Sequence, residues 1–282
     1  MNAVPAPICW PVEAIRQAVE PLLPGFTAEV LPEIDSTNSE LMRRFKTGRP
    51  EPTLLVAEHQ NAGRGRLGRS WYSARGDSLT FSLGLPLQPA DWSGLSLAVG
   101  ISLAENLDPA NAAGHRIGLK WPNDLWLCIP GLERKLAGIL VETARWDGLR
   151  HVVIGIGINI RSMTMTGLAD SLQPAMPASI PPAGLQELLP GIDAANALER
   201  VVPPLVCAVQ AFEQFGFAPF QSRFERRDVL ANRRVQLHDG QQLLQGSAHG
   251  VGDNGALRVL TTAGMKEITS AEVSVRPLGQ LC

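Results

Sequence analysis

The chain is poor in several features that would narrow its function at once. Its 282 residues include four cysteines, at positions 9, 128, 207 and 282, and no C-x-x-C pair. Such spacing argues against a disulfide framework or a zinc site and favours a reducing compartment. The start lacks the basic and apolar regions of a signal peptide. The longest uncharged stretch, residues 171–186, carries four prolines, so we expect no membrane span and a cytoplasmic protein.

Net charge is also low. The formal charge is −2, with 45% hydrophobic and 18% charged residues, which is ordinary for a globular protein. A chain without a strong positive field has no general attraction for nucleic acid. The residues before position 35 leave little room for a helix-turn-helix and contain no basic recognition helix. We therefore expect no nucleic-acid partner.

Lysine is the scarcest charged residue, with four lysines against 21 arginines. Two of the four, Lys120 and Lys135, lie close together, about fifty residues after a segment in which Gly alternates with Arg (residues 63–69). Lys and Arg are not interchangeable where a compact, mobile charge is needed. The two segments together predict a site for phosphate and carboxylate groups.

Hydrophobic periodicity predicts an α+β chain with two domains. The Thr37/Glu40 spacing predicts a capping box before a helix at residues 38–45. A second helix is expected at residues 194–214, where the prolines at 203–204 predict a kink or two shorter helices. We expect residues 163–190 to form an irregular loop. Short strands after residue 227 predict a small barrel, giving domains 1–227 and 228–282. The other expected helices are 12–23 and 93–107, and the expected strands are 54–58, 79–87, 116–120, 125–128, 135–142 and 151–160, the last of them central.

The Gly/Arg segment allows several interpretations. Residues 63–68 match G-x-G-x-x-G after a strand, but a Rossmann fingerprint opens a helix, and here turn and strand follow. An RGG-type RNA-binding segment would be repetitive and of low complexity. A plain surface turn explains the glycines and leaves the clustered arginines unexplained. The interpretation that accounts for both is a loop whose N–H groups and guanidiniums close over an anion.

The sequence shows no candidate nucleophile, base or metal cage. The run Gly76-Asp77-Ser78-Leu79 mimics an esterase signature, but no D-x-x-H pair exists to activate Ser78, which we interpret as a strand start. The histidines lack metal-ligand spacing. Residues 155–159 lack a third Gly and predict close backbone packing beside a ligand. Cations without a nucleophile suit chemistry in which the substrate brings its own, such as attack of a carboxylate on the α-phosphate of ATP.

Five segments together resemble the biotin–protein ligases in order and spacing: residues 35–38, 60–71, 120–124, 135–142 and 155–159. Residues 271–276 are similar to the family's C-terminal Gly-Glu-Val-Ser segment, with Ala in place of Gly. The resemblance covers residues 33–282. It implies a mixed, mainly antiparallel sheet flanked by helices, as in class II aminoacyl-tRNA synthetases and lipoyl ligases, followed by an SH3-like β-barrel.

The resemblance also implies a reaction. Biotin and MgATP would give biotinyl-5′-adenylate and pyrophosphate, and a lysine of a biotin carboxyl carrier domain would then take the biotin and release AMP. With only about 34 residues before the first motif, we expect a ligase without the DNA-binding domain of repressor members. A lipoate- or octanoyl-transferring relative and a non-catalytic nucleotide-binding module remain as alternatives. Monomer and homodimer both stay open.

The roles of individual residues are likewise implied by the resemblance. Lys135 and Arg66 are the expected catalytic residues, and no metal is expected on the protein apart from the Mg²⁺ that accompanies ATP. The expected biotin-binding residues are Ser36, Thr37, Asn38, Gln60, Arg64, Gly65, Arg66 and Lys135. The expected ATP-binding residues are Arg66, Arg69, Trp71, Lys120, Asn123, Asp124 and Asn159.

Overall fold

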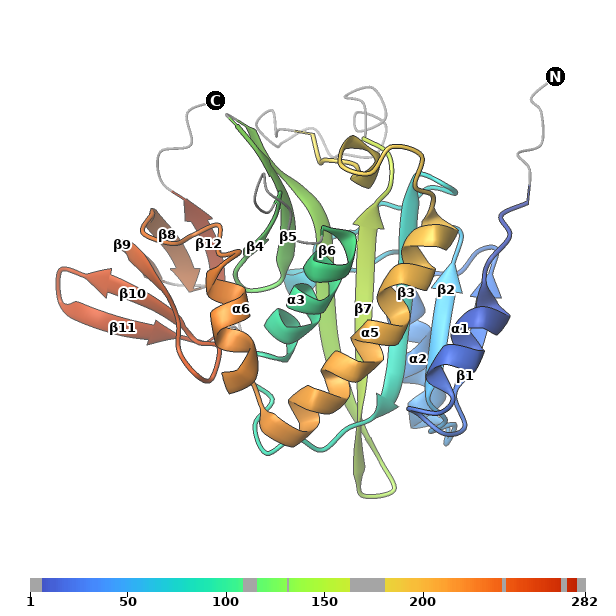
Figure 1. Cartoon of the computed structure of the whole chain (residues 1–282). Coiled ribbons are helices and arrows are strands. Elements are labelled where there is room, and N and C mark those ends of the chain that lie inside the picture. Colours follow the sequence, from blue (N-terminus) through green and yellow to red (C-terminus); the bar gives the residue numbers. More distant parts are fainter. Residues whose placement is uncertain are drawn as a thin grey trace.

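A computed structural model describes residues 7–108, 116–130, 132–162, 181–239, 242–269 and 273–277. Its main element is a seven-stranded sheet in the order β1-β2-β3-β7-β6-β5-β4 (Figure 1). Only β1 and β2 run parallel, so the sheet is mixed and mainly antiparallel, as predicted. The strands are β1 (Thr27–Leu31), β2 (Thr53–Ala57), β3 (Ser78–Pro86), β4 (Ile117–Lys120), β5 (Asp124–Ile129), β6 (Leu132–Trp146) and β7 (Leu149–Asn159).

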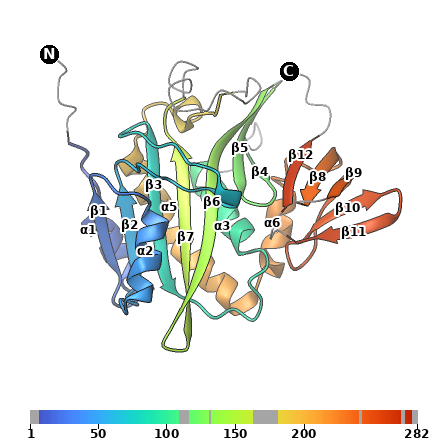
Figure 2. The ribbon, with the colours of Figure 1, turned by 180° about the vertical axis from the view of Figure 1, so that it is seen from behind.

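Helices cover the two faces of this sheet unequally. One face carries α1 (Val12–Val19), α3 (Leu95–Leu107) and α5 (Ala194–Phe215), which enclose the large core (Figure 1). The other face carries α2 (Thr37–Lys46), with a smaller core around Phe45 (Figure 2). Part of that second face is therefore left for a site. In the described residues, no helix has the length and apolarity needed to cross a membrane.

Strand β7 is fourth of the seven, which confirms the predicted central position. Its alternate residues point to opposite faces. Ile154, Ile156 and Ile158 belong to the large core, whereas Val153 belongs to the smaller core under α2. Gly155 and Gly157 lie between these isoleucines and so face the side of α2 and the site.

Two local predictions were wrong. The residue that caps α2 is Ser36, whose Oγ accepts a hydrogen bond from Ser39 N, and helix α2 begins at Thr37 rather than Asn38. Helix α5 is one element across Pro203 and Pro204, so the expectation of two shorter helices is wrong, while the alternative of a kink stays a prediction. The carbonyls that lose their N–H partners belong to Glu199 and Arg200, which are exposed, so water can satisfy them while the opposite face stays packed. Most of the expected 163–190 loop lies outside the described residues.

The C-terminal region forms a second, five-stranded antiparallel sheet in the order β11-β10-β9-β8-β12. This arrangement is compatible with the SH3-like expectation, and the described residues form no closed barrel. Strand β11 was not anticipated. The short helix α6 (Gln221–Glu225) precedes this sheet, whose strands are β8 (Arg234–Asp239), β9 (Gln242–Val251), β10 (Leu257–Thr261), β11 (Gly264–Ile268) and β12 (Val273–Pro277).

The two sheets are joined at the turn that follows β4. The indole Nε1 of Trp121, a fully buried side chain, donates to the carbonyl of Gly255 at 3.1 Å. Backbone hydrogen bonds also link Leu119 with Arg227 and Val229. The second sheet therefore supports the segment that contains Lys120 and Asp124.

Candidate active site

One pocket brings together almost all of the residues singled out from the sequence. It lies between the start of α2, residues 63–71, the turn at 121–124 and the face of β6 and β7, and encloses about 960 Å³ including its open mouth. That size suits a small-molecule site. Asn159, buried at the end of β7, is the one member of the predicted set outside this lining. The predicted residues that line the pocket are Ser36, Thr37, Asn38, Gln60, Arg64, Gly65, Arg66, Arg69, Trp71, Lys120, Asn123, Asp124 and Lys135.

The buried polar end of the pocket, here called the pocket floor, is lined by Ser36, Thr37, Asn38 and Gln60, and Ser82 lies behind them; each of the five is at most 9% exposed. Ser82 Oγ donates to Thr37 Oγ1 at 2.7 Å. Thr37 Oγ1 and Thr37 N in turn donate to Gln60 Oε1, at 3.1 and 2.8 Å. The floor is a neutral, preformed network of hydrogen bonds, in which each group polarises the next.

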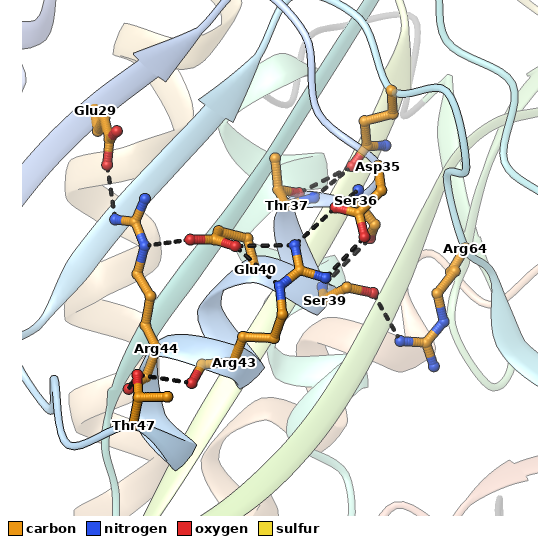
Figure 3. A network of polar contacts seen from close by, with 11 residues as sticks. Glu29, Asp35, Ser36, Thr37, Ser39, Glu40, Arg43, Arg44, Thr47 and Arg64 are labelled. Carbon is orange, nitrogen blue, oxygen red and sulfur yellow. Dashed lines mark hydrogen bonds and ion pairs between the residues drawn. The ribbon is translucent and has the colours of Figure 1, made fainter.

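The start of α2 is fixed from the outside by a charged cluster (Figure 3). The Asp35 carboxylate accepts from Ser36 N at 2.7 Å and from both terminal nitrogens of Arg43. These guanidinium hydrogen bonds lower the pKa of Asp35 to about 2. The charges thus point away from the floor, and Asp35 orients the backbone that places Ser36 and Thr37.

Asn38 lies directly against the central strand. A side chain at Gly155 would place its Cβ 2.2 Å from Asn38 Oδ1, so only glycine fits there. Asn38 Oδ1 shares the single Ser82 hydroxyl proton with Thr37 Oγ1, each oxygen lying 2.7 Å from Ser82 Oγ, and Asn38 Nδ2 donates to Glu142 Oε2 at 2.9 Å. This contact explains the first glycine of the 155–159 segment.

Trp71 lies over two further glycines. Gly138 of β6 and Gly157 of β7 are paired across the sheet, and a Cβ at Gly157 would lie 2.3 Å from the Trp71 ring. The predicted close packing in this segment is therefore confirmed. Among the described residues nothing accepts a hydrogen bond from the buried Trp71 Nε1. The indole forms a flat wall between the floor and the turn at 121–124.

Lys135 stands beside this wall. Its ammonium nitrogen is 2.7 Å from Asp124 Oδ1 and 5.7 Å from the centre of the Trp71 ring. Lys120 lies at 4.6 Å over the Trp126 ring. The side chain of Asn123 donates to Ile139 O at 2.8 Å, so it holds the turn to β6. One lysine is thus oriented into the middle of the pocket by a carboxylate and an aromatic face.

The open side of the pocket is crossed by residues 63–69, here called the basic loop. Gly65 N donates to Arg69 O, and Arg66–Gly68 form one turn of 3-10 helix. Arg64 and Arg69 are exposed, while Arg66 is half-buried. Burial lowers the pKa of the Arg66 guanidinium, against the opposing effect of Asp124. A partly desolvated cation of this kind favours an anionic ligand.

Sequence reasoning missed two residues here. Ser82 looks like any polar residue in a β-strand, and its role depends on which residues of α2 lie above it. Glu142 is the last residue of segment 135–142 and has no expected role from the sequence, yet it contacts both Asn38 and Arg64. The described residues contain no group of three or more His, Cys, Asp or Glu able to hold a metal ion.

Comparison with known proteins agrees with this geometry. A model of the biotin/lipoate A/B protein ligase family matches residues 30–159, and a model of the biotin protein ligase C-terminal domain matches residues 231–276. The bifunctional ligase/repressor BirA of Escherichia coli is 37% identical over 260 residues, covering 90% of this chain and 75% of that protein. The biotin–[acetyl-CoA-carboxylase] ligase of Paracoccus denitrificans is 29% identical over 250 residues, covering 86% of this chain and 98% of that one.

A solved structure gives the same result. The biotin protein ligase of Aquifex aeolicus in complex with biotin and ATP superposes with a TM-score of 0.69 at 31% identity, over 89% of this chain and 98% of that one. The residues matched by the two family models include the floor, the basic loop, Lys135 and nearly all of the second sheet. A neutral polar floor, a basic loop and a lysine between them, in a chain this similar in sequence and structure, establish that the protein belongs to the biotin protein ligase family.

Proposed function

We propose that the protein joins biotin to ATP, giving biotinyl-5′-adenylate and pyrophosphate, and then transfers the biotin to a lysine of a biotin carboxyl carrier domain. The observation that carries the proposal is a single pocket with a neutral hydrogen-bonding floor at one end, cations at the other and Lys135 between them. A ligand with an uncharged polar ring and a carboxylate tail matches that division.

The first step needs alignment of two anions that repel each other. The biotin carboxylate attacks the α-phosphorus of MgATP, a P–O bond forms, and the bond to pyrophosphate breaks. Lys135 would neutralise charge on both the carboxylate and the α-phosphate, and Arg66 would hold the adenylate under the basic loop. Mg²⁺ would enter with the nucleotide, and Asp124 is the carboxylate among the described lining residues that could contact it.

The remaining predicted contacts belong to the same proposal. Ser36, Thr37, Asn38 and Gln60 would surround the ring, and Trp71 would face the adenine, with Asn159 behind it at the end of β7. In the second step the carrier's lysine amine attacks the anhydride carbonyl and AMP leaves. Residues 228–282 would act as a unit that supports the nucleotide side, consistent with the hydrogen bond between Trp121 and Gly255.

Pyrophosphate release tests the proposal directly. The purified chain, given MgATP, should release pyrophosphate with biotin and only weakly with lipoate or octanoate, because the floor's donors and acceptors suit a polar ring. Radiolabelled biotin should then appear on a carrier domain and should be absent from a carrier whose acceptor lysine is replaced by arginine. Equal turnover of octanoate would favour the lipoyl-ligase alternative, and nucleotide binding without pyrophosphate release would favour a binding module.

A further inference from the structure

Glu142 contacts both ends of the pocket. This residue of β6 accepts from Asn38 Nδ2 through Oε2 at 2.9 Å, and from Arg64 Nη2 through Oε1 at 2.8 Å. Arg64 Nη1 is also 3.4 Å from Glu142 Oε2, so the carboxylate and guanidinium face each other through two pairs of atoms. One carboxylate thus joins the pocket floor to the basic loop.

The Asn38 side chain is fully used within the protein. Its Nδ2 donates to Glu142 and, at 3.4 Å, to Leu140 O, while its Oδ1 accepts from Ser82. The Asn38 amide is pressed against Gly155 and only 3% of the residue is exposed. This orientation turns the polar atoms of Asn38 toward the sheet. Asn38 therefore fixes the Glu142 carboxylate rather than offering a free donor to a ligand.

Arg64 is also engaged on two elements. Besides Glu142 on β6, its Nη1 donates to Ser39 Oγ on α2 at 3.1 Å, and Figure 3 shows the side chain reaching from the loop toward Ser39. Its positive charge is compensated by Glu142. Arg66, the next arginine, is instead half-buried beside Asp124. Arg64 and Arg66 thus face different partners.

We propose that Glu142 is a positioning residue which, oriented by Asn38, fixes the basic loop across the pocket by binding Arg64. Contact with the ligand's anionic groups is then left to Arg66 and Lys135. What the loop covers rests on the proposed function, whereas the attachment of the loop rests on geometry alone. The Asn38 and Arg64 side chains then hold the basic loop in place, instead of contacting biotin as the resemblance implied.

The surroundings of the Glu142–Arg64 ion pair determine how much its loss should open the loop. An isolated exposed ion pair contributes little, because both side chains lose freedom when they meet. Here Glu142 is already held by a buried amide and Arg64 has a second partner, so less freedom remains to be lost. We expect loss of the Glu142 charge to increase the open population of the loop about tenfold.

Limited trypsin digestion measures that population without any substrate. Trypsin can cleave the loop after Arg64, Arg66 and Arg69, and we use the last two, whose side chains do not bind Glu142, to report the opening. Cleavage of a transiently open segment follows its population when reclosing is fast. Glu142→Gln and Asn38→Asp should each accelerate early cleavage at these two points, by about tenfold for Glu142→Gln. Glu133→Gln is the matched control, because it removes a carboxylate of the same strand that pairs with Arg233, away from the pocket.

Unfolding midpoints identify variants whose cleavage reflects global instability. If Asn38→Asp fails to fold, the Glu142→Gln variant alone tests the proposal. Unchanged loop cleavage in Glu142→Gln would overturn the proposal, whatever the protein's activity. If the wild type releases no pyrophosphate from biotin and MgATP, the proposed function fails while digestion still tests the attachment.

A double-mutant cycle provides a second readout. Arg64→Gln, Glu142→Gln and the double variant should lose the adenylate at similar rates, because each breaks one connection. The KM for biotin should rise with little change in kcat. Additive losses, or a much larger loss in Arg64→Gln alone, would mean that Arg64 contacts the ligand directly and would overturn the inference.

Discussion

The pocket floor and the basic loop are built on opposite principles. The floor is almost fully buried, and its groups hydrogen-bond to one another: Ser82 with Thr37 and Asn38, and Thr37 with Gln60. The loop is largely exposed, carries three arginines and includes Leu67, which is 54% exposed with a φ of 55°. One region is rigid and neutral, the other accessible and charged.

This difference matches two tasks of adenylate chemistry. A polar ring is discriminated best by donors and acceptors already in place, because a poorer ligand leaves them unpaired. Anionic groups that arrive, react and leave need charges on a segment that can open and close. The following predictions, from the largest effect to the smallest, test whether the two regions divide the work in this way.

Lys135→Ala should lower pyrophosphate release by about 10²-fold or more, since it removes the charge between floor and loop where the reacting groups would meet. Lys266→Ala, on exposed β11, is the matched control for loss of a lysine. Initial rates at saturating biotin and MgATP give the comparison. A rate within about threefold of wild type would remove Lys135 from the chemistry.

Thr37→Val should damage the floor alone. The variant keeps its shape but loses the hydroxyl that joins Ser82 to Gln60, while Thr37 N still donates to Gln60 and Ser82 Oγ still donates to Asn38. The loss is that of the hydroxyl's own hydrogen bonds, about 1 kcal/mol each. The KM for biotin should rise about tenfold or more while the KM for ATP stays constant. Thr53→Val, at the far end of β2, controls for loss of a buried threonine hydroxyl. Equal increases in both KM values would erase the distinction between the two regions.

Arg66→Gln should damage the loop alone. We expect retention of the adenylate to fall about tenfold, because charge-assisted hydrogen bonds are lost. The rate of adenylate formation should stay nearer to that of the wild type. Escaped adenylate should biotinylate lysines of a bystander protein, as blotting with streptavidin would detect. Arg145→Gln, at the exposed end of β6, is the control. Slow transfer confined to the carrier would show that Arg66 does not retain the intermediate.

Mild acid should affect the scaffold under the floor and spare the loop, whose arginines do not titrate in this range. His151 of β7 is 1% exposed and packs on Phe45 of α2, with ring centres 4.7 Å apart. Burial lowers its pKa below the ordinary 6.5, opposed in part by a backbone contact with Leu149. As the pH falls, the unfolded chain therefore takes up a proton on His151 before the folded chain does. The free energy of unfolding is unaffected by this group above about pH 6.5 and falls as the pH drops below that value.

The slope from this one group cannot exceed about 1.4 kcal/mol per pH unit. Denaturant unfolding between pH 7 and pH 5 measures it. His151→Leu should flatten the profile and His249→Gln, at an exposed position, should not. An unchanged profile in His151→Leu would assign the pH dependence to other groups.

Local patterns were sufficient for much of the fold. The scarcity of charged residues in 151–160 predicted a central strand, and β7 is central because both of its faces are covered, one by the large core and one by α2 and the site. The scarcity of lysine singled out Lys120 and Lys135, and the alternating Gly and Arg singled out the basic loop. The prolines at 203–204 do not divide helix α5 in two, because burial of one face of the helix outweighs two missing hydrogen bonds.

The sequence by itself indicated which residues meet at the site, because the rarity of lysine and the alternating Gly and Arg mark two segments and the resemblance to the biotin–protein ligases groups them with three others. Only the tertiary structure decided how those residues divide their roles. Ser82 and Glu142 lie 44 and 104 positions from Asn38 along the chain, and their hydrogen bonds with it arise from the stacking of α2 on the sheet. Contacts of that kind depend on packing between distant elements, which no local pattern records.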